Sequence, residues 1–374
     1  MNSIGGKVAI TGVGLVSPFG TDPTEIARAV ADGDSGLAWL REPPPADVKS
    51  RGLYAGGLAS YESKFGHDPV VEMAVQAAEH AVTDAHLQLS SLDLNRVGSV
   101  IGTSKGLLDT YAENFGSTNT PLAYPGFEPN RAALQVARHF GCGGPCLCPI
   151  AACATGLACL ERGVRLIRSG YCDVVIAGSS DASICDWVLN SFNRLGVLAK
   201  NFDQPNNAVR PFSDDRDGFL VGEGAAVFVL ESETHARSRQ ARVRAEWLGS
   251  SAGSDPTGMT QIDETGENFA PIIRSCLNRA AVSPNDIDLL NLHGTATQAN
   301  DTCEANAITH VFGSRPINRR AYKATIGHCL GAAASLEIGL SLVHGGWQTQ
   351  LKTSLGFGGH SFAAVLSNEQ EFGI

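Results

Sequence analysis

The 374-residue sequence has no run of lysine and arginine, and its formal net charge is −10. Binding to nucleic-acid phosphates needs clustered positive charge, so we expect no nucleic-acid partner. The sequence also lacks any uncharged apolar stretch of the ~18 residues that a membrane span requires, so we expect no membrane partner. A secretory signal has a basic start, a continuous apolar core and a cleavage site. Residues 1–20 have none of these features. These absences together predict a cytoplasmic protein.

Charged residues are scarce, at 18% of the chain against roughly 25% in typical soluble domains. Hydrophobic residues make up 43%. This balance indicates extensive burial, including a subunit interface. The length corresponds to two domain-sized units at roughly 150 residues each.

The ten cysteines show no regular spacing. Without a secretion signal they are expected to be reduced thiols rather than a disulfide framework. A metal-binding module made of His139, Cys142, Cys146 and Cys148 is a possible alternative. Their spacing does not form a C-x2-C motif, so we predict no metal site.

The chain contains the same order of patterns twice. A helical pattern over residues 72–89 precedes a strand pattern over 97–101, and a helical pattern over 268–282 precedes a strand pattern over 288–292. Each strand pattern is soon followed by Gly-Thr. Strands that alternate with helices at this spacing favour buried, largely parallel sheets covered by helices. The sequence therefore predicts a duplicated α/β fold.

We place the two halves at residues 1–235 and 236–374, divided in a charged, serine-rich stretch. A duplicated unit of this kind predicts a site between its halves.

Cys153 has an unusual local context. It lies where a turn of small residues meets a helix pattern over 154–168, which Gly170 ends. Unpaired N–H groups and the helix dipole at such a position favour a thiolate, so we expect a lowered thiol pKa. A buried structural thiol is the alternative, because free cysteine is among the most buried residue types. The turn-to-helix position makes Cys153 the candidate nucleophile.

A nucleophilic cysteine needs polar partners that the fold brings near it. His293 ends a predicted buried strand, and His328 begins a second helix of small residues. Both positions face the expected cleft between the halves. We interpret the other histidines as structural: His67, His80, His86, His139, His235, His310 and His344.

Residues 356–360 place three glycines around Phe357. Such a loop can direct backbone N–H groups at an oxyanion. An ordinary hairpin turn explains the same residues equally well.

Taken together, these residues resemble the β-ketoacyl-acyl-carrier-protein synthases of the elongating, Cys-His-His type, and the resemblance covers nearly the whole chain. The matching segments are VAITGVGLVSPFG at 8–20, AACATG at 151–156, RPF at 210–212, DRDGF at 215–219, GEG at 222–224, HGTAT at 293–297, Asn300-Asp301, Glu304, Lys323, Gly327-His328, GAA at 331–333 and GFGG at 356–359. The resemblance implies a thiolase-like duplicated fold, layered α-β-α-β-α with two mixed sheets.

The resemblance also implies a mechanism. Cys153 would take an acyl chain from the phosphopantetheine arm of an acyl carrier protein and hold it as a thioester. His293 and His328, as neutral N–H donors, would stabilise the enolate formed when a malonyl thioester loses CO2. The enolate would then attack the Cys153 thioester. No metal or organic cofactor is implied, because the prosthetic arm arrives on the carrier.

Further roles follow from the same resemblance. The N–H groups of Cys153 and Phe357 would form an oxyanion hole, with Phe357 also acting as a gate. Lys323 would order the region of His328 electrostatically, and Glu337 would support it through the following helix.

Four positions relate to substrate binding in the family. Thr295 and Thr297 match residues that bond the pantetheine arm, and Phe192 matches a wall of the acyl pocket. Lys105 falls where an apolar residue usually closes that pocket. An unpaired buried cation is costly, so we expect a pocket that is short, polar or wet.

Several departures from the family pattern suggest a specialised role. Leu355 and Ser361 replace the usual Phe and Asn, residues 192–200 lack the usual Arg-Ala-Leu-Ser pattern, and the segment between His328 and Phe357 is short. These features favour a polyketide or polyene synthase over a housekeeping fatty-acid enzyme. The expected partners are an acyl carrier protein, acyl and malonyl thioesters, and a second copy or a related ketosynthase-like subunit. A silent chain-length subunit would lack the nucleophile, which is present here.

Overall fold

The computed structural model describes residues 6–44, 50–64, 66–115 and 128–368. Its strands are β1 (Val8–Val16), β2 (Ala38–Trp39), β3 (Ala55–Gly57), β4 (Val97–Gly102), β5 (Cys146–Leu147), β6 (Val174–Asp181), β7 (Val221–Gly222), β8 (Gly224–Ser232), β9 (Ala245–Ser254), β10 (Leu289–Asn291), β11 (Asn318–Arg320), β12 (Thr349–Gly356) and β13 (His360–Ser367).

The α-helices are α1 (Pro23–Asp32), α2 (Pro69–Asp84), α3 (Leu108–Phe115), α4 (Arg131–Phe140), α5 (Thr155–Arg168), α6 (Asp186–Leu195), α7 (Glu233–Ser238), α8 (Ala270–Ala280), α9 (Gln298–Phe312), α10 (Lys323–Ile326) and α11 (Ala333–His344). No helix within the described residues is long and apolar enough to cross a membrane.

The two halves of the chain have the same strand topology. In the first half the strand order is β5-β4-β6-β8-β1, and in the second it is β11-β10-β12-β13-β9. In each half the first three strands of that order pair in parallel and the remaining pairs are antiparallel. The predicted duplication is therefore present in the hydrogen-bonding pattern itself.

The two mixed sheets expected from the resemblance are joined. Residues 8–10 of β1 pair with 245–247 of β9, so the two five-stranded sheets form one continuous ten-stranded sheet. A short separate sheet has the order β2-β3-β7. The predicted division after residue 235 falls within α7, shortly before β9.

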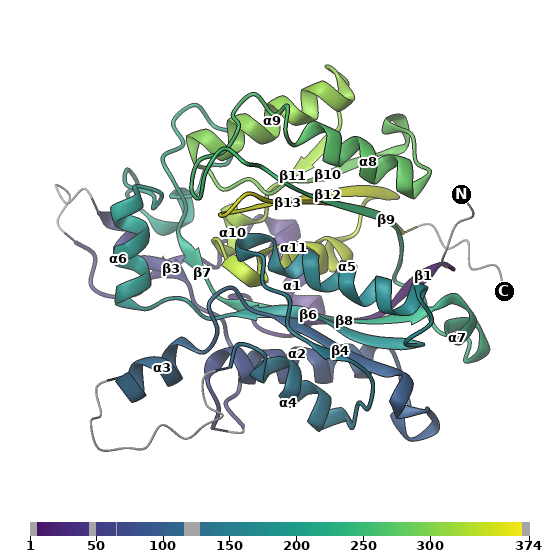
Figure 1. The fold of residues 1–374 in the computed structure, drawn as a ribbon. Coiled ribbons are helices and arrows are strands. Elements are labelled where there is room, and N and C mark those ends of the chain that lie inside the picture. The colour runs from purple at the N-terminus through teal and green to yellow at the C-terminus, as the bar shows by residue number, and fades with distance from the viewer. Residues whose placement is uncertain (1–5, 45–49, 65, 116–127, 369–374) are drawn as a thin grey trace.

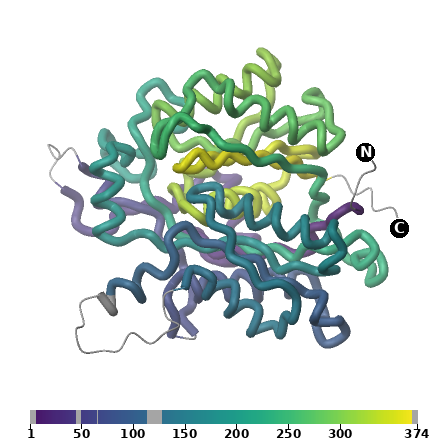
Figure 2. The backbone as a smooth tube through the Cα atoms, in the orientation of Figure 1, coloured from purple at the N-terminus to yellow at the C-terminus, as the bar shows by residue number. Residues whose placement is uncertain are grey.

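Helices and sheets form the expected layers. Figure 1 shows α8 and α9 outside the second-half strands, α5 and α11 between the two sheet halves, and α2 and α4 outside the first-half strands. The tube in Figure 2 follows the same stacking from the purple N-terminal strand to the yellow C-terminal strands. The thiolase-like α-β-α-β-α arrangement is confirmed, and the central helices α5 and α11 contact each other.

Strands β1 and β6 are buried on both faces, as expected for a sheet covered by helices. Every residue of these two strands is buried. Two glycines of β1 let helix α2 lie directly on the strand: a Cβ on Gly14 would fall 1.9 Å from the carbonyl oxygen of Ala77, and one on Gly12 would fall 2.1 Å from that of Ala81. The helix pattern predicted at 72–89 corresponds to α2, which begins earlier because Asp68 caps its N-terminus.

Candidate active site

Cys153 lies at the start of the central helix α5. A 3-10 turn over Ala152–Ala154 leads into α5, and the Thr155 hydroxyl accepts a hydrogen bond from the N–H of Ala151 (2.9 Å) and donates one to the carbonyl of Ala152 (2.7 Å). Ala152 adopts a φ of 47°, a conformation that costs energy for a residue with a Cβ. The predicted turn-to-helix position is confirmed, and a strained residue directly precedes the cysteine.

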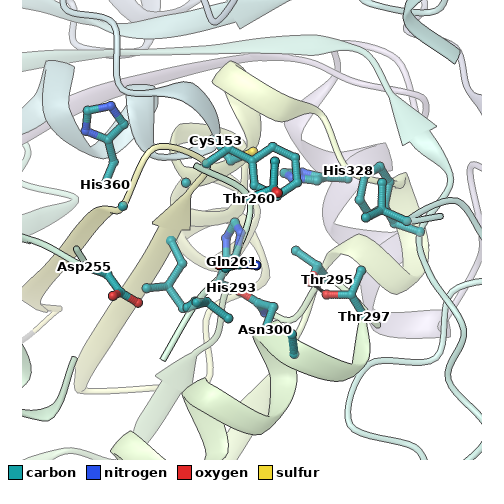
Figure 3. Close-up of a pocket in the computed structure, with 18 of the residues that line it drawn as sticks. Cys153, Asp255, Thr260, Gln261, His293, Thr295, Thr297, Asn300, His328 and His360 are labelled. Carbon is teal, nitrogen blue, oxygen red and sulfur yellow. Dashed lines mark hydrogen bonds between the residues drawn. The ribbon is translucent and has the colours of Figure 1, made fainter. Parts of the chain in front are cut away.

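The second half of the chain contributes both histidines. His293 lies two residues beyond β10, and His328 follows α10. Their rings are 5.5 Å apart between centroids, at an interplanar angle of 84°, and both residues are almost fully buried. Cys153, His293 and His328 line one cavity of about 130 Å³ (Figure 3). The fold thus brings together the three residues that the sequence singled out.

Both histidines are kept neutral. Burial lowers the pKa of His293 well below its usual range, and the positive charges of Lys323 and Lys352 lower it further. Burial and the charge of Lys323 act in the same way on His328. The structure therefore supports neutral imidazoles, as expected for N–H donors.

Lys323 fixes the tautomer of His293. Its Nζ lies 3.2 Å from Nδ1 and 2.5 Å from the carbonyl oxygen of His293. An ammonium group can only donate, so Nδ1 accepts and the proton of the neutral ring is on Nε2. Lys323 therefore contacts His293 directly and acts on His328 through its charge.

Glu337 supports this arrangement from helix α11. Its Oε1 lies 2.5 Å from Nζ of Lys323, and its Oε2 accepts a hydrogen bond from Lys352 on β12. All three side chains are buried. Sequence reasoning missed Lys352, and only the packing of β12 against α11 reveals it.

The pKa of the Cys153 thiol differs from the expectation. We expected the helix N-terminus to lower it, but burial raises it above its usual value. The charges of Lys105 and Lys323 and the backbone N–H of Phe357 oppose this shift only in part. Desolvation of a thiolate outweighs the helix dipole here. The residue as a whole is half-buried, so the sulfur stays open to the cavity.

The glycine loop is both a hairpin and part of the site. Gly356 pairs with His360 across the turn between β12 and β13. A Cβ on Gly356 would lie 3.2 Å from the backbone nitrogen of Cys153, so this loop packs tightly on the nucleophile turn. Phe357 lines the cavity and its N–H faces the thiol. The two interpretations left open by the sequence are therefore compatible.

The proposed substrate-binding residues divide into two groups. Thr295 and Thr297 line the cavity, with their hydroxyl oxygens 2.9 Å apart, and Phe192 lines it from α6. Lys105 does not line it. Its Nζ lies 5.4 Å from the ring centroid of Phe192 and 2.9 Å from the Ser104 hydroxyl. Lys105 is exposed, so the expected cost of a buried cation does not arise.

Several further residues line the cavity without a role assigned to them from the sequence, although Asn300 lies in one of the matching segments. Asp255, Gln261, Asn300 and His360 line it (Figure 3). Asp255 anchors the loop that follows β9, because its carboxylate accepts hydrogen bonds from the N–H groups of Thr257 and Asp263. A loop built by such local bonds is visible only in three dimensions.

The alternative metal module is not assembled. Nε2 of His139 lies 3.0 Å from the Glu79 carboxylate. Burial raises the pKa values of Cys142 and Cys148 to about 11. Within the described ranges, no group of three or more His, Cys, Asp or Glu side chains could hold a metal ion.

Comparison with known proteins identifies the family. Residues 6–236 match the model for the β-ketoacyl synthase N-terminal domain, and residues 244–344 match that for the C-terminal domain. The 3-oxoacyl-[acyl-carrier-protein] synthase I, chloroplastic, of Arabidopsis thaliana is 34% identical over 348 residues, covering 88% of this chain and 74% of the relative. The tetracenomycin polyketide synthase ketoacyl synthase alpha subunit of Streptomyces glaucescens is 29% identical, with 98% of each chain covered.

Solved structures agree. A type II PKS acyl-carrier protein in complex with its ketosynthase bound to the hexaketide has a TM-score of 0.88 at 27% identity, covering 97% of this chain and 99% of that one. The ishigamide ketosynthase/chain length factor has a TM-score of 0.86 at 27% identity, with the same coverage. This chain therefore belongs to the β-ketoacyl synthase family and is an acyltransferase of the 3-oxoacyl-ACP synthase type.

Proposed function

We propose that this enzyme condenses an acyl chain held on Cys153 with a malonyl thioester, both delivered on the phosphopantetheine arm of an acyl carrier protein. The observation that carries the proposal is the shared cavity of Cys153, His293 and His328, with the N–H of Phe357 directed at the thiol. No metal or organic cofactor takes part in the proposed reaction.

In the first half-reaction, the Cys153 sulfur attacks the acyl thioester carbonyl. The bond from that carbonyl to the carrier sulfur breaks, the carrier leaves as a thiol, and the proton of Cys153 is transferred to it. The N–H groups of Cys153 and Phe357 stabilise the oxyanion that forms transiently. Because burial raises the thiol pKa, such donors are needed to make attack favourable.

In the second half-reaction, the malonyl thioester loses CO2. The electron pair of the broken C–C bond moves into an enolate, whose oxygen accepts hydrogen bonds from Nε2–H of His293 and from the His328 ring. Neutral N–H donors held in place in a buried site can stabilise this negative charge through hydrogen bonds. The enolate carbon then attacks the Cys153 thioester, releasing the thiolate and a β-ketoacyl product two carbons longer.

The residues that line the cavity are proposed to contact the two ends of the substrates. We propose that Thr295 and Thr297 bond the pantetheine arm, that Phe192 bounds the acyl chain, and that Phe357 gates access to Cys153. All four line the cavity, with the threonines and Phe192 on different elements.

We favour a polyketide or polyene pathway and a ketosynthase-like partner subunit. Two solved ketosynthase structures, one titled with a type II PKS carrier protein and one with a chain length factor, align over 97% of this chain and 99% of their own. The curated plastid synthase aligns over only 74% of its length. Its 34% identity supports housekeeping fatty-acid elongation as the second candidate, with a homodimer as the corresponding assembly.

Mass spectrometry of the acyl species trapped on the enzyme during turnover tests the pathway. Chains that retain oxo groups or conjugated double bonds support the specialised pathway, and fully saturated chains support fatty-acid elongation. Light scattering of the chain alone and after co-expression with a candidate partner subunit tests the assembly.

A further inference from the structure

A cluster of buried charges lies behind His293, on the side away from the cavity. Lys323 and Lys352 bind the two oxygens of Glu337, and none of the three side chains is more than 1% exposed. Lys352 also donates to Oδ1 of Asn291 at 3.1 Å. It contacts neither histidine ring, so any influence on the reaction passes through Glu337 or through its charge.

Lys323 has no spare hydrogen-bonding capacity. Its ammonium group has three protons, and its three partners are Nδ1 of His293, the carbonyl oxygen of His293 and Oε1 of Glu337. The direction of these bonds depends on where Glu337 holds Lys323. Because Lys352 binds the other oxygen of Glu337, it fixes the carboxylate from the opposite side.

Glu304 lies on the backbone side of His293. Its carboxylate accepts hydrogen bonds from the N–H groups of His293 (2.8 Å) and Gly294 (2.9 Å), and from the Thr353 hydroxyl (2.5 Å). Burial raises its pKa, whereas those three bonds oppose the shift. With both carboxylates ionised, two negative charges face the two lysines.

The balance of positive and negative charge behind His293 matters because an enolate must form beside this residue. Without Lys352, the two glutamates and Lys323 would leave a net charge of −1 behind the ring, in a dry site where charge interactions are strong. The titratable and charged groups around His293 are Lys323 on α10, His328 after α10, Glu337 on α11, Lys352 on β12, and Glu304 and Asp301 on α9, with Arg216 3.7 Å from Asp301.

We propose that Lys352 is a positioning residue for the decarboxylation half-reaction. It holds Glu337 so that Lys323 keeps donating to Nδ1 of His293, and its charge offsets that of Glu304. This inference rests on the proposed function, because it concerns the step in which His293 stabilises the enolate.

Two neutral variants test the proposal. K352M and K352Q remove the charge with side chains of different shape, so K352Q serves if K352M does not fold. Q350M is the matched control: Gln350 is buried on the same face of β12 and also bonds Asn291, but it carries no charge and does not contact Glu337. Each variant is assayed for acylation of Cys153 and for decarboxylation of malonyl carrier protein across pH.

We expect the neutral variants to acylate Cys153 within about twofold of wild type and to decarboxylate at least about tenfold more slowly at pH 7, the effect of one pKa unit of lost electrostatic stabilisation. The acidic limb of their decarboxylation pH profile should move to higher pH. The positive charge of Lys352 lowers the pKa of His293, so its removal raises that pKa and protonates the ring at a higher pH.

A purely structural role for Lys352 would slow both half-reactions together and leave the acidic limb in place. The proposal is overturned if the decarboxylation profile of the folded variants overlays that of wild type, or if Q350M shifts it equally. A wild-type protein that neither acylates nor decarboxylates would instead refute the proposed function itself.

Discussion

Replacing Glu337 with glutamine should destabilise the protein strongly. Its carboxylate is 1% exposed and binds two ammonium groups that are fully buried. E337Q keeps the shape of the side chain but leaves both lysines without a negative partner, and removing one partner of a buried ion pair costs about 3–5 kcal/mol. For 374 residues, an unfolding entropy of roughly 2.1 cal/mol/K per residue turns this loss into a melting-temperature drop of roughly 4–6 °C.

Thermal unfolding followed by circular dichroism measures the shift. E25Q is the matched control, because the Glu25–Arg28 pair has a similar 2.8 Å separation but is well exposed, and it should leave the melting curve unchanged. The triple variant K323M/E337M/K352M should melt closer to wild type than E337Q does, because it removes the three charges together and leaves neither lysine facing a neutral side chain. An E337Q protein that melts within 1 °C of wild type would refute this reasoning about the cluster.

Three further predictions concern the two half-reactions. H293A and H328A should still form the acyl adduct on Cys153 while losing most malonyl decarboxylation, and loss of acylation with decarboxylation intact would contradict this division of roles. The wild-type decarboxylation rate should stay constant as the pH falls through 6.5 and decline only well below it. Burial and Lys323 lower both histidine pKa values, so each ring stays neutral until the pH reaches its lowered pKa. A stopped-flow pH profile checks this, and a midpoint at or above pH 6.5 would oppose it. K105M should slow the alkylation of Cys153 by iodoacetamide at pH 8 about two- to threefold, because removing this partly screened cation raises the thiol pKa further. An unchanged rate would show that Lys105 does not influence the thiol.

The nucleophile and the histidines could be found from sequence because each lies at the end of a recognisable element. A turn of small residues before a helix marks Cys153, and His293 lies two residues beyond an apolar strand. Local patterns of this kind depend on a few neighbouring residues, so they can be recognised without knowing the rest of the fold.

The environments of these residues could not be found in the same way. The sequence shows the helix N-terminus at Cys153 but not the burial that raises its thiol pKa. Lys105 is a neighbour of the acyl pocket in the family pattern, yet here it is exposed behind Phe192. Desolvation depends on what packs from distant parts of the chain, and no local pattern records it.

Lys352 illustrates the same limit most clearly. Within β12 it looks like a solvent-facing lysine in an alternating strand, but α11 covers that face and supplies Glu337. No sequence pattern indicates that the two sheet halves are joined, because the join consists of only three residue pairs between β1 and β9.

The proposed mechanism requires Cys153 to carry the growing chain. The decisive measurement is intact-protein and peptide mass spectrometry after incubation with an acyl carrier protein loaded with an acyl thioester. We expect one acyl adduct, on the peptide that contains Cys153, which is absent from the folded C153A variant. No adduct on the wild-type protein, or an adduct that persists in C153A, would rule out this role for Cys153.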